Sequence, residues 1–235
     1  SAELRPYLGL MREDPELVSL LGGLVRSQAQ CILIDPYANA FNREPNDRHW
    51  CDDDRPRPDP SVWERKYELD SLAYFMDFAY RFWKESGVTS VFDDVFRQAL
   101  HRVVDLLITE QRHDELSTYY FCRPGARSLR ERLPNKGRGA PTNPCGLVWS
   151  GFRPSDDACT YGYLIPSNAF AVAALRGVRE LVDTVLSDSY LATKIDELAW
   201  EIDLAIQRYG IVEHRQFGRV YCYETDAMGN HVLID

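Results

Sequence analysis

The sequence has few cysteines, and none of them lies at a metal-binding spacing. Its six cysteines in 235 residues include no C-x-x-C pair, and no matching pair of histidines follows them, which argues against a zinc site. Six is also too few for a scaffold that depends on disulfide bonds. The acidic stretch at 51–59 lacks the glycine and the final glutamate of a calcium-binding EF-hand loop. We therefore expect no bound metal and no other cofactor.

Positive charge is also scarce. The chain has 27 Lys and Arg against 36 Asp and Glu, a net charge of −9, which disfavours nucleic acid as a partner. No uninterrupted apolar run approaches the roughly 18 residues of a transmembrane helix, so we expect no membrane contact. The first residues, SAELRPYLGL, lack the basic and apolar regions of a signal peptide, which favours a cytoplasmic location. Because the chain does not begin with methionine, its natural start and its compartment stay open.

What the sequence does contain is typical of a globular, helix-rich protein. Hydrophobic residues make up 45% of the chain and charged residues 27%. Apolar residues at three- and four-residue spacing predict five helices, at about 15–33, 64–86, 91–111, 167–186 and 189–209. The segments 220–224 and 231–234 flank a turn and predict a short β-hairpin near the C-terminus. The predicted fold class is all-α.

The lengths of the connections predict how these helices are arranged. About four residues join the second helix to the third, and two or three join the fourth to the fifth, so each pair is antiparallel. Almost thirty residues separate the first two helices, and more than fifty separate the third from the fourth. If short and long connections alternate, the long loops all emerge at one end. We therefore predict stacked helical hairpins with a functional rim, as in α-solenoids and α/α toroids.

Three loop segments combine carboxylates, amides and aromatic rings: DPYANAFN at 35–42, WERKYE at 63–68 and WSGFRPSDDACTYGY at 149–163. A sugar ring needs both kinds of group, because aromatic faces pack on its C–H groups while polar side chains bond its hydroxyls. The candidate substrate-binding residues in these segments are Asn39, Asn42, Glu64, Lys66, Trp149 and Arg153.

Each segment also has a plain structural interpretation. The amides of Asn39 and Asn42 could bond the backbone of their own loop. Glu64 and the charged residues after it could complement the dipole at the start of a helix. Trp63 and Trp149 could belong to the core. Composition alone leaves both interpretations open.

Asp156 and Asp157 are the candidate catalytic residues. They are adjacent and flanked by aromatic residues, so burial and like charge would raise the pKa of at least one of them, as a general acid requires. The alternative is that Ser155 caps a short turn and the two aspartates complement its dipole. Residue chemistry leaves these alternatives about even.

A basic stretch, RPGARSLRERLPNKGRG, occupies 123–139 and contains six Lys or Arg and one Glu. Taken alone, it is compatible with the binding of phosphate or another anion. A solvated loop on an otherwise acidic protein is the simpler interpretation, and we expect that one here.

Three long motifs resemble glycoside hydrolase family 125, the exo-acting α-1,6-mannosidases. They are DPYANAFN, WERKYELDSL and WSGFRPSDDACTYGYLIPSN, and the later stretch YGIVEH…VYCYETDAMGN is similar too. The resemblance implies an (α/α)6 barrel, metal-independent hydrolysis with inversion, and removal of terminal mannose from α-1,6-linked, N-glycan-type mannosides. It also implies that the partner is a mannose-containing oligosaccharide and that the general acid is Asp156 or Asp157.

The sequence also departs from the family pattern. The resemblance places a Trp-Leu-Arg-Asp-Ser segment before this start, of which only Ser1 could remain, and a glutamate base after the match to 231–235. We therefore expect residues 1–235 to be part of a single catalytic domain and of an incomplete barrel. A non-catalytic carbohydrate-binding protein and an α-solenoid that binds other proteins are the alternative functions.

Overall fold

The computed structural model describes residues 2–234, so Ser1 and its expected relation to the Trp-Leu-Arg-Asp-Ser segment lie outside the described residues. All five predicted helices are present. They are α1 (Pro15–Ile34), α2 (Leu69–Ser86), α3 (Asp94–Glu110), α6 (Ile165–Leu181), which a π-helical turn extends through Val182–Leu186, and α7 (Ser189–Tyr209). Asp14, Asp93 and Asp188 cap α1, α3 and α7 by accepting backbone N–H groups.

Shorter elements fill the connections. The helical ones are α4 (His113–Leu116), α5 (Pro134–Gly137) and 3₁₀ turns at Arg5–Leu10 and Leu129–Glu131. The strands are β1 (Ala40–Phe41), β2 (Val62–Glu64), β3 (Tyr163–Leu164), β4 (Ile211–His214), β5 (Gly218–Tyr221), β6 (Glu224–Thr225) and β7 (His231–Val232). They form three small antiparallel sheets among the described residues, with orders β1-β2, β3-β6-β7 and β4-β5.

The predicted start of the second helix is wrong by five residues. Glu64 lies in β2, opposite Ala40 of β1, and Glu68 is still extended before α2 begins at Leu69. Tertiary hydrogen bonds hold this segment out of the helix, since the backbone N–H of Tyr67 donates to the hydroxyl of Tyr119 at 2.9 Å. Local periodicity does not register such long-range partners.

The predicted C-terminal hairpin is correct only in part. Glu224–Thr225 does pair with His231–Val232, as expected. The residues before it belong to another hairpin, in which Gly218–Tyr221 pairs with Ile211–His214. The predicted strand at 220–224 is therefore divided between two sheets.

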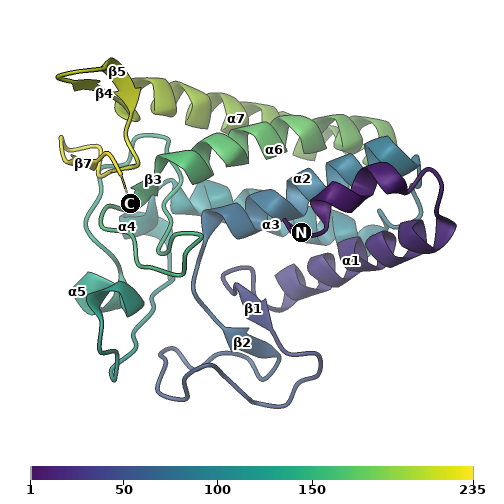
Figure 1. Ribbon diagram of the computed structural model, residues 1–235, viewed down its shortest axis with the longest axis horizontal. Coiled ribbons are helices and arrows are strands. Elements are labelled where there is room, and N and C mark those ends of the chain that lie inside the picture. Colours follow the sequence, from purple (N-terminus) through teal and green to yellow (C-terminus); the bar gives the residue numbers. More distant parts are fainter. Residues whose placement is uncertain (1, 235) are drawn as a thin grey trace.

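The long loops gather at one end of the helix array, as predicted. Figure 1 shows the β1–β2 loop, α4, α5 and the small sheets near the ends where α1, α3 and α7 finish and where α2 and α6 begin. The main helix contacts are those of α2 with α6, α6 with α7, and α1 with α3. Of the two predicted hairpins, the fourth and fifth helices do form a contacting pair, α6 with α7, whereas α2 and α3 pack mainly on α6 and α1. The loops still emerge at one loop-bearing rim; the closure of six hairpins into a barrel stays a prediction.

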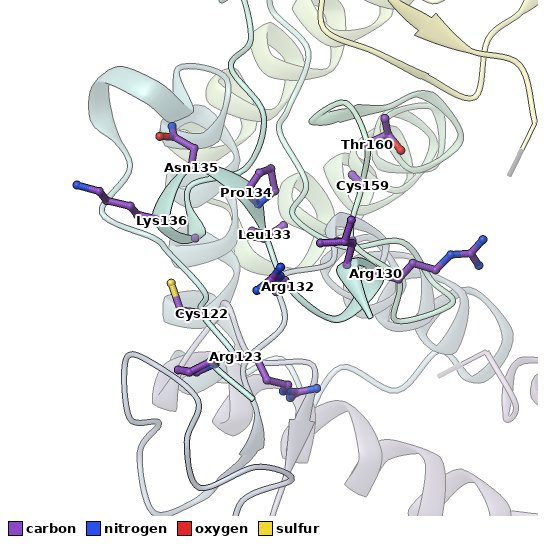
Figure 2. Close-up of a pocket in the computed structure, with 14 residues that line it drawn as sticks. Cys122, Arg123, Arg130, Arg132, Leu133, Pro134, Asn135, Lys136, Cys159 and Thr160 are labelled. Atoms are coloured by element: carbon purple, nitrogen blue, oxygen red, sulfur yellow. The ribbon is translucent and has the colours of Figure 1, made fainter. Parts of the chain in front are cut away.

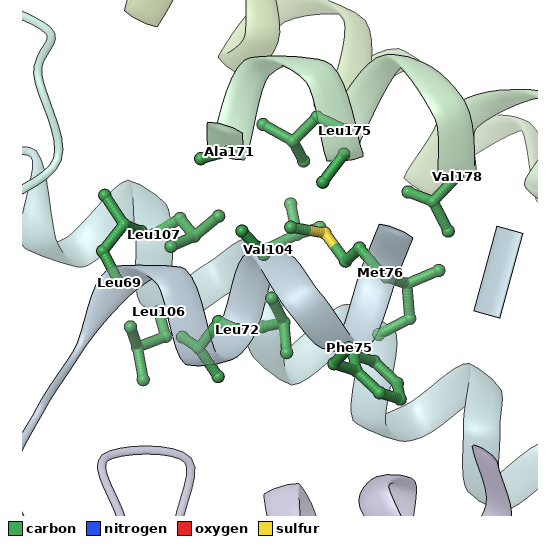
Figure 3. Packing of buried hydrophobic residues seen from close by; sticks show 14 of the residues in the cluster. Leu69, Leu72, Phe75, Met76, Val104, Leu106, Leu107, Ala171, Leu175 and Val178 are labelled. Atoms are coloured by element: carbon green, nitrogen blue, oxygen red, sulfur yellow. The ribbon is translucent and has the colours of Figure 1, made fainter. Parts of the chain in front are cut away.

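The core lies where side chains of α2, α3 and α6 meet, and the most extensive helix contact in it is that of α2 with α6. Figure 3 shows side chains from these helices meeting, with α2 contributing Leu69, Leu72, Phe75 and Met76, α3 contributing Val104 and Leu107, and α6 contributing Ala171, Leu175 and Val178. All are buried, and burying each of the larger ones contributes about 1.5–3 kcal/mol. This packing fixes the helix ends from which the site loops emerge.

Helix α1 passes a simple test for a membrane span, with a mean hydropathy of 1.5 over its most apolar window. The search for an uninterrupted apolar run misses it, because polar residues, among them Arg26, Ser27 and Gln28, interrupt the run. Core helices of soluble proteins pass the same test. Leu21, Val25, Ala29 and Ile32 on α1 are buried in the cluster that α2 and α3 also form.

Candidate active site

The two candidate catalytic aspartates lie at the tip of a tight turn. The backbone N–H of Arg153 donates to the carbonyl of Asp157 at 2.8 Å, and that of Asp156 donates to the carbonyl of Arg153 at 2.9 Å. Asp156 has a φ of +67°, a left-handed conformation that aspartate tolerates better than most residues. The aspartates do lie in a short turn, as the structural alternative held, although no helix begins at Ser155 within residues 2–234.

Both aspartates line a polar cavity of about 540 Å³ at the loop-bearing rim, which we call the carboxylate cavity. Its wall also includes Asn39, Glu64, Lys66, Glu68, Trp50 and Trp63. The predicted residues Asn39, Glu64 and Lys66 therefore share one cavity with the aspartate pair, although they come from separate loops. The volume lies within the range of small-molecule sites.

Asn39 connects three of the carboxyl groups. Its side-chain N–H₂ group lies 3.1 Å from Asp156 Oδ1, 3.4 Å from Glu68 Oε1 and 3.5 Å from Glu64 Oε2. Its side-chain oxygen accepts the backbone N–H of Lys66 at 3.2 Å. The Asn39 amide thus bonds the loop backbone, as the structural interpretation held, and also fixes the positions of the cavity's acidic groups.

Two cations balance these acids. Lys66 is buried, and its ammonium group donates to the backbone carbonyl of Asp156 at 2.9 Å. The same ammonium nitrogen lies 3.7 Å from Glu64 Oε1. Arg123 is 5% exposed. Its guanidinium donates to Glu64 at 2.7 Å and makes a bidentate interaction with Asp54, with two hydrogen bonds of 2.7 Å. Charge-assisted forks of this kind fix geometry strongly. Arg123 therefore contradicts the expectation that 123–139 is wholly a solvated loop.

The burial expected for the aspartate pair is found at Glu68 instead. The side chain of Asp156 is 59% exposed and that of Asp157 28% exposed, so the premise of two desolvated carboxyls is wrong. Burial raises the pKa of Glu68 to about 8, and the negative charges of Asp70 and Asp156 add to the effect. Glu68 is therefore mostly protonated at neutral pH and can donate a hydrogen bond in the cavity.

Replacing Glu68 by glutamine should make the free energy of unfolding less dependent on pH. The pKa of Glu68 is raised from 4.5 to about 8 on folding. Between these values the folded state retains a proton that the unfolded state has lost, so the stability of the wild type falls as pH rises. Between pH 4.5 and about 8, the free energy of unfolding of Glu68→Gln should therefore rise relative to that of the wild type by more than about 1 kcal/mol. Urea unfolding at a series of pH values measures the difference.

Glu115→Gln is the matched control, because Glu115 lies at the surface in a pair with Arg112. Its difference from the wild type should not grow over the same window. A Glu68→Gln difference that is constant with pH would contradict the assignment of the raised pKa to Glu68.

Three predicted site residues lie outside the carboxylate cavity. Asn42 donates to two backbone carbonyls of its own loop, at 2.8 and 3.2 Å, as its structural interpretation held. Trp149 is 1% exposed and stacks on His113 with ring centres 3.6 Å apart, so it is a core residue. Arg153 is also buried, and its Nε donates to Glu224 at 2.6 Å. Trp63, also considered for the core, lines the cavity instead.

Several residues of the site escaped prediction. Glu224 is fully buried and accepts Arg153 and the backbone N–H groups of Thr160 and Tyr161, which ties β6 to the loop that carries the aspartates. Trp50 is 64% exposed at the cavity wall and meets the edge of Trp63, with ring centres 6.2 Å apart. The stretch that resembles the family contains Glu224, but nothing in its sequence marked Glu224 as a residue of the site. Trp50 directly precedes the acidic stretch at 51–59 and belongs to none of the motifs.

The side chains of the cavity do not form a metal-binding cluster. Within the part of the chain that the structure describes, no group of three His, Cys, Asp or Glu side chains is placed to hold a metal ion. Lys66 and Arg123 neutralise the acids in place of a cation. What the cavity offers is carboxyl, amide and indole groups around a small concave space.

Comparison with known proteins decides the family. The family model described as metal-independent α-mannosidase (GH125) matches residues 1–235. The chain belongs to this family. The family assignment based on the four motifs is thus confirmed. A match over the whole chain also leaves the alternative of an unrelated α-solenoid without support.

Two relatives illustrate the family. The "Meiotically up-regulated gene 157 protein" of Schizosaccharomyces pombe is 35% identical over 251 residues, which cover 99% of this chain and 48% of that protein. A structure of a metal-independent α-mannosidase from Streptococcus pneumoniae, in a non-productive complex with α-1,6-mannobiose, is 39% identical with a TM-score of 0.95. It covers 98% of this chain and 54% of the other. The chain thus spans about half the length of these GH125 relatives.

Proposed function

We propose that this GH125 chain contributes the acid side of the active site of an exo-acting, inverting α-1,6-mannosidase. The substrate would be an N-glycan-type oligosaccharide with a non-reducing terminal mannose. The observation that carries the proposal is the carboxylate cavity, in which Asp156 and Asp157 stand beside amide, ammonium and indole groups. The relative from S. pneumoniae, seen with α-1,6-mannobiose, supports the choice of linkage.

Each predicted residue takes a role that its position allows. One carboxyl of the Asp156–Asp157 pair protonates the glycosidic oxygen as the bond breaks. Asn39, Glu64 and Lys66 bond sugar hydroxyls, and the exposed indole of Trp50 offers an apolar face to the ring. Asn42, Trp149 and Arg153 contribute to substrate binding indirectly, by holding the loops that carry these groups.

Inversion requires a second carboxyl that activates water on the opposite face of the sugar, roughly 6.5–9.5 Å from the acid. Glu64 is held by Arg123 and Lys66, so it is poorly placed to take a proton from water. Glu68 has a pKa raised to about 8, which makes it a protonated group at neutral pH and not a base. We therefore propose that the base is a glutamate outside residues 1–235, as the resemblance implies.

In the full-length protein, which would carry the proposed base, the first product released from α-1,6-mannobiose should be β-mannose. In an inverting reaction, water attacks the face opposite the leaving group, so the anomeric configuration changes once. Proton NMR during the first minutes of turnover distinguishes the two anomers before mutarotation mixes them. The α-1,2- and α-1,3-linked mannobioses are the matched controls and should be hydrolysed much more slowly. Initial α-mannose, or equal rates on all three linkages, would overturn this part of the proposal.

Prolonged treatment with EDTA should leave the hydrolysis rate unchanged. The reaction as proposed needs only carboxyl groups and water, and Lys66 and Arg123 balance the charge of the acids. The rate on α-1,6-mannobiose before and after dialysis against chelator tests this. A calcium-dependent mannosidase treated in parallel shows that the chelation was effective. A loss that added Ca²⁺ or Zn²⁺ restores would count against metal-independent hydrolysis.

A further inference from the structure

Glu110, the last residue of α3, lies where the three motif loops of the candidate site converge. Its side chain is fully buried, and its Oε1 accepts the hydroxyl of Tyr37 at 2.7 Å. Its backbone carbonyl accepts the N–H of Trp149 at 3.1 Å. The ring of Tyr67 stacks on Trp149 with ring centres 6.0 Å apart and meets Tyr37 edge-on at 5.2 Å. One aromatic cluster thus joins the three motif loops at Glu110, and none of the roles proposed above uses this carboxyl group.

The second carboxyl oxygen of Glu110 meets the imidazole of His113, which is 1% exposed. His113 Nδ1 lies 2.6 Å from Glu110 Oε2, and His113 Nε2 lies 3.0 Å from the backbone carbonyl of Arg138. Because a carbonyl oxygen only accepts, Nε2 carries a proton. Another proton lies between Nδ1 and Oε2, since two lone pairs would repel each other at 2.6 Å. The pair therefore holds one proton more than a neutral imidazole and a carboxylate would hold together.

The surroundings of the pair favour an imidazolium beside a carboxylate. Burial raises the pKa of the Tyr37 hydroxyl, and the negative charge of Glu110 adds to the effect, so Tyr37 keeps its proton and donates it to Glu110. The ring of His113 stacks on Trp149 with centres 3.6 Å apart and planes 10° apart. The face of an indole attracts a cation, which stabilises the charged form of His113.

The same pair anchors the end of the basic stretch at 123–139. The guanidinium of Arg138 donates to the carbonyl of His113 at 2.9 Å and to two other backbone carbonyls at 2.7 and 3.1 Å. Figure 2 shows the part of the stretch before Arg138, which lines a cavity of about 650 Å³ together with the loop at 158–160. Because Arg123 is fixed in the carboxylate cavity, the basic stretch is held at both ends.

We propose that Glu110 and His113 are positioning residues of the active site and form a buried carboxylate–imidazolium pair that holds the three motif loops together. Glu110 acts through Tyr37, which lies two residues before Asn39, whose amide bonds the aspartate turn. His113 acts through Trp149, in the loop that carries the aspartates. The effect on catalysis rests on the proposed mannosidase function, whereas the protonation of His113 and the placement of Asn39 do not.

Nitrogen NMR of the full-length protein with isotope-labelled histidine tests the protonation of the pair. At neutral pH both ring nitrogens of His113 should resonate as protonated nitrogens, because each donates a hydrogen bond. In Glu110→Gln the amide can donate to Nδ1 and still accept from Tyr37, so His113 should become the neutral tautomer with its proton on Nε2. The exposed His231 on β7 is the internal reference and should be the same in both proteins.

The signals of His113 are identified by their loss in His113→Gln. A singly protonated His113 in the wild type would overturn the carboxylate–imidazolium pair. So would a His113 that stays doubly protonated in Glu110→Gln.

Tyr37→Phe tests the positioning role, because it removes only the hydroxyl that Glu110 accepts. In the full-length protein, the NMR signals of the Asn39 side-chain amide should shift. The kcat on α-1,6-mannobiose should fall about tenfold, because small displacements of catalytic groups are costly. Tyr80→Phe is the matched control, since Tyr80 donates to Glu180 at 3.0 Å outside the carboxylate cavity. It should leave the Asn39 signals unchanged and alter kcat less than about twofold.

Circular dichroism establishes that each variant is folded. Equal effects of Tyr37→Phe and Tyr80→Phe on the Asn39 amide would overturn the positioning role, and so would an unchanged kcat in Tyr37→Phe. If the full-length wild type hydrolysed no mannoside, the proposed function would fail. The two NMR measurements need no turnover, so they would still decide whether the pair exists and whether it holds Asn39 in place.

Discussion

In the full-length protein, replacing Asp156 or Asp157 by asparagine is expected to abolish most hydrolysis of α-1,6-mannobiose while sparing sugar binding. An amide keeps the shape of the carboxyl and its ability to accept hydrogen bonds, but it cannot deliver a proton to the leaving oxygen. General acid catalysis contributes roughly 10²–10⁴-fold, so the residue that is the acid should lose about that much in kcat. Initial rates, with affinity measured separately by titration, determine both effects.

Substrates with different leaving groups separate an acid from a structural residue. An aryl mannoside such as 4-nitrophenyl α-mannoside departs as a stable phenolate and needs little protonation. The variant that removes the acid should therefore lose far less activity on the aryl substrate than on mannobiose. The other aspartate of the pair serves as the nearest control, and Asp203→Asn on the exposed face of α7 serves as the distant one. Equal losses on both substrates in both variants would contradict a general acid in this pair.

Helices were the part of the fold that the sequence predicted well, because their apolar residues recur with the helix period. The stripe from Leu69 to Met76 is buried in the core, where α2 packs on α6, which is why its pattern is clear. Glu64 was predicted to open that helix because charged residues there suit a helix dipole. The structure places Glu64 in a strand instead, where Arg123 and Lys66 pair with it. Such partners are invisible to a local pattern.

In the candidate site, too, local motifs predict some residues, whereas roles that depend on tertiary contacts are not predicted. Asn39, Lys66 and the aspartates were found because the residue types that bond sugars cluster in short motifs, and the structure brings those motifs into one cavity. The raised pKa of Glu68 and the anchoring role of Glu224 were missed because they arise from burial and from partners far along the chain. Trp149 was assigned to the cavity on its chemistry alone. Its place against His113 depends on packing that sequence does not encode locally.

Replacing Glu224 by alanine should destabilise the protein by about 3–5 kcal/mol, because it removes the buried carboxylate to which Arg153 Nε and two backbone N–H groups donate. Glu224 is fully buried and accepts three hydrogen bonds, from Arg153 at 2.6 Å and from the backbone of Thr160 and Tyr161 at 2.8 and 2.9 Å. Glu224→Gln keeps the size of the side chain but loses the charge, so we expect a smaller cost, of about 1.5–3 kcal/mol. Urea unfolding monitored by circular dichroism measures both.

Catalysis should suffer as well, since the turn at Arg153–Asp157 depends on this anchor. Under conditions where the variants remain folded, kcat on α-1,6-mannobiose should fall in both Glu224 variants, because small displacements of catalytic groups are costly. Glu213→Ala is the matched control: Glu213 lies exposed on β4 opposite Arg219, and its loss should cost less than about 1 kcal/mol with no effect on kcat. If Glu224→Ala resembled Glu213→Ala in both the free energy of unfolding and kcat, Glu224 would not anchor the turn at Arg153–Asp157. The backbone hydrogen bonds of the turn would then be sufficient to hold it.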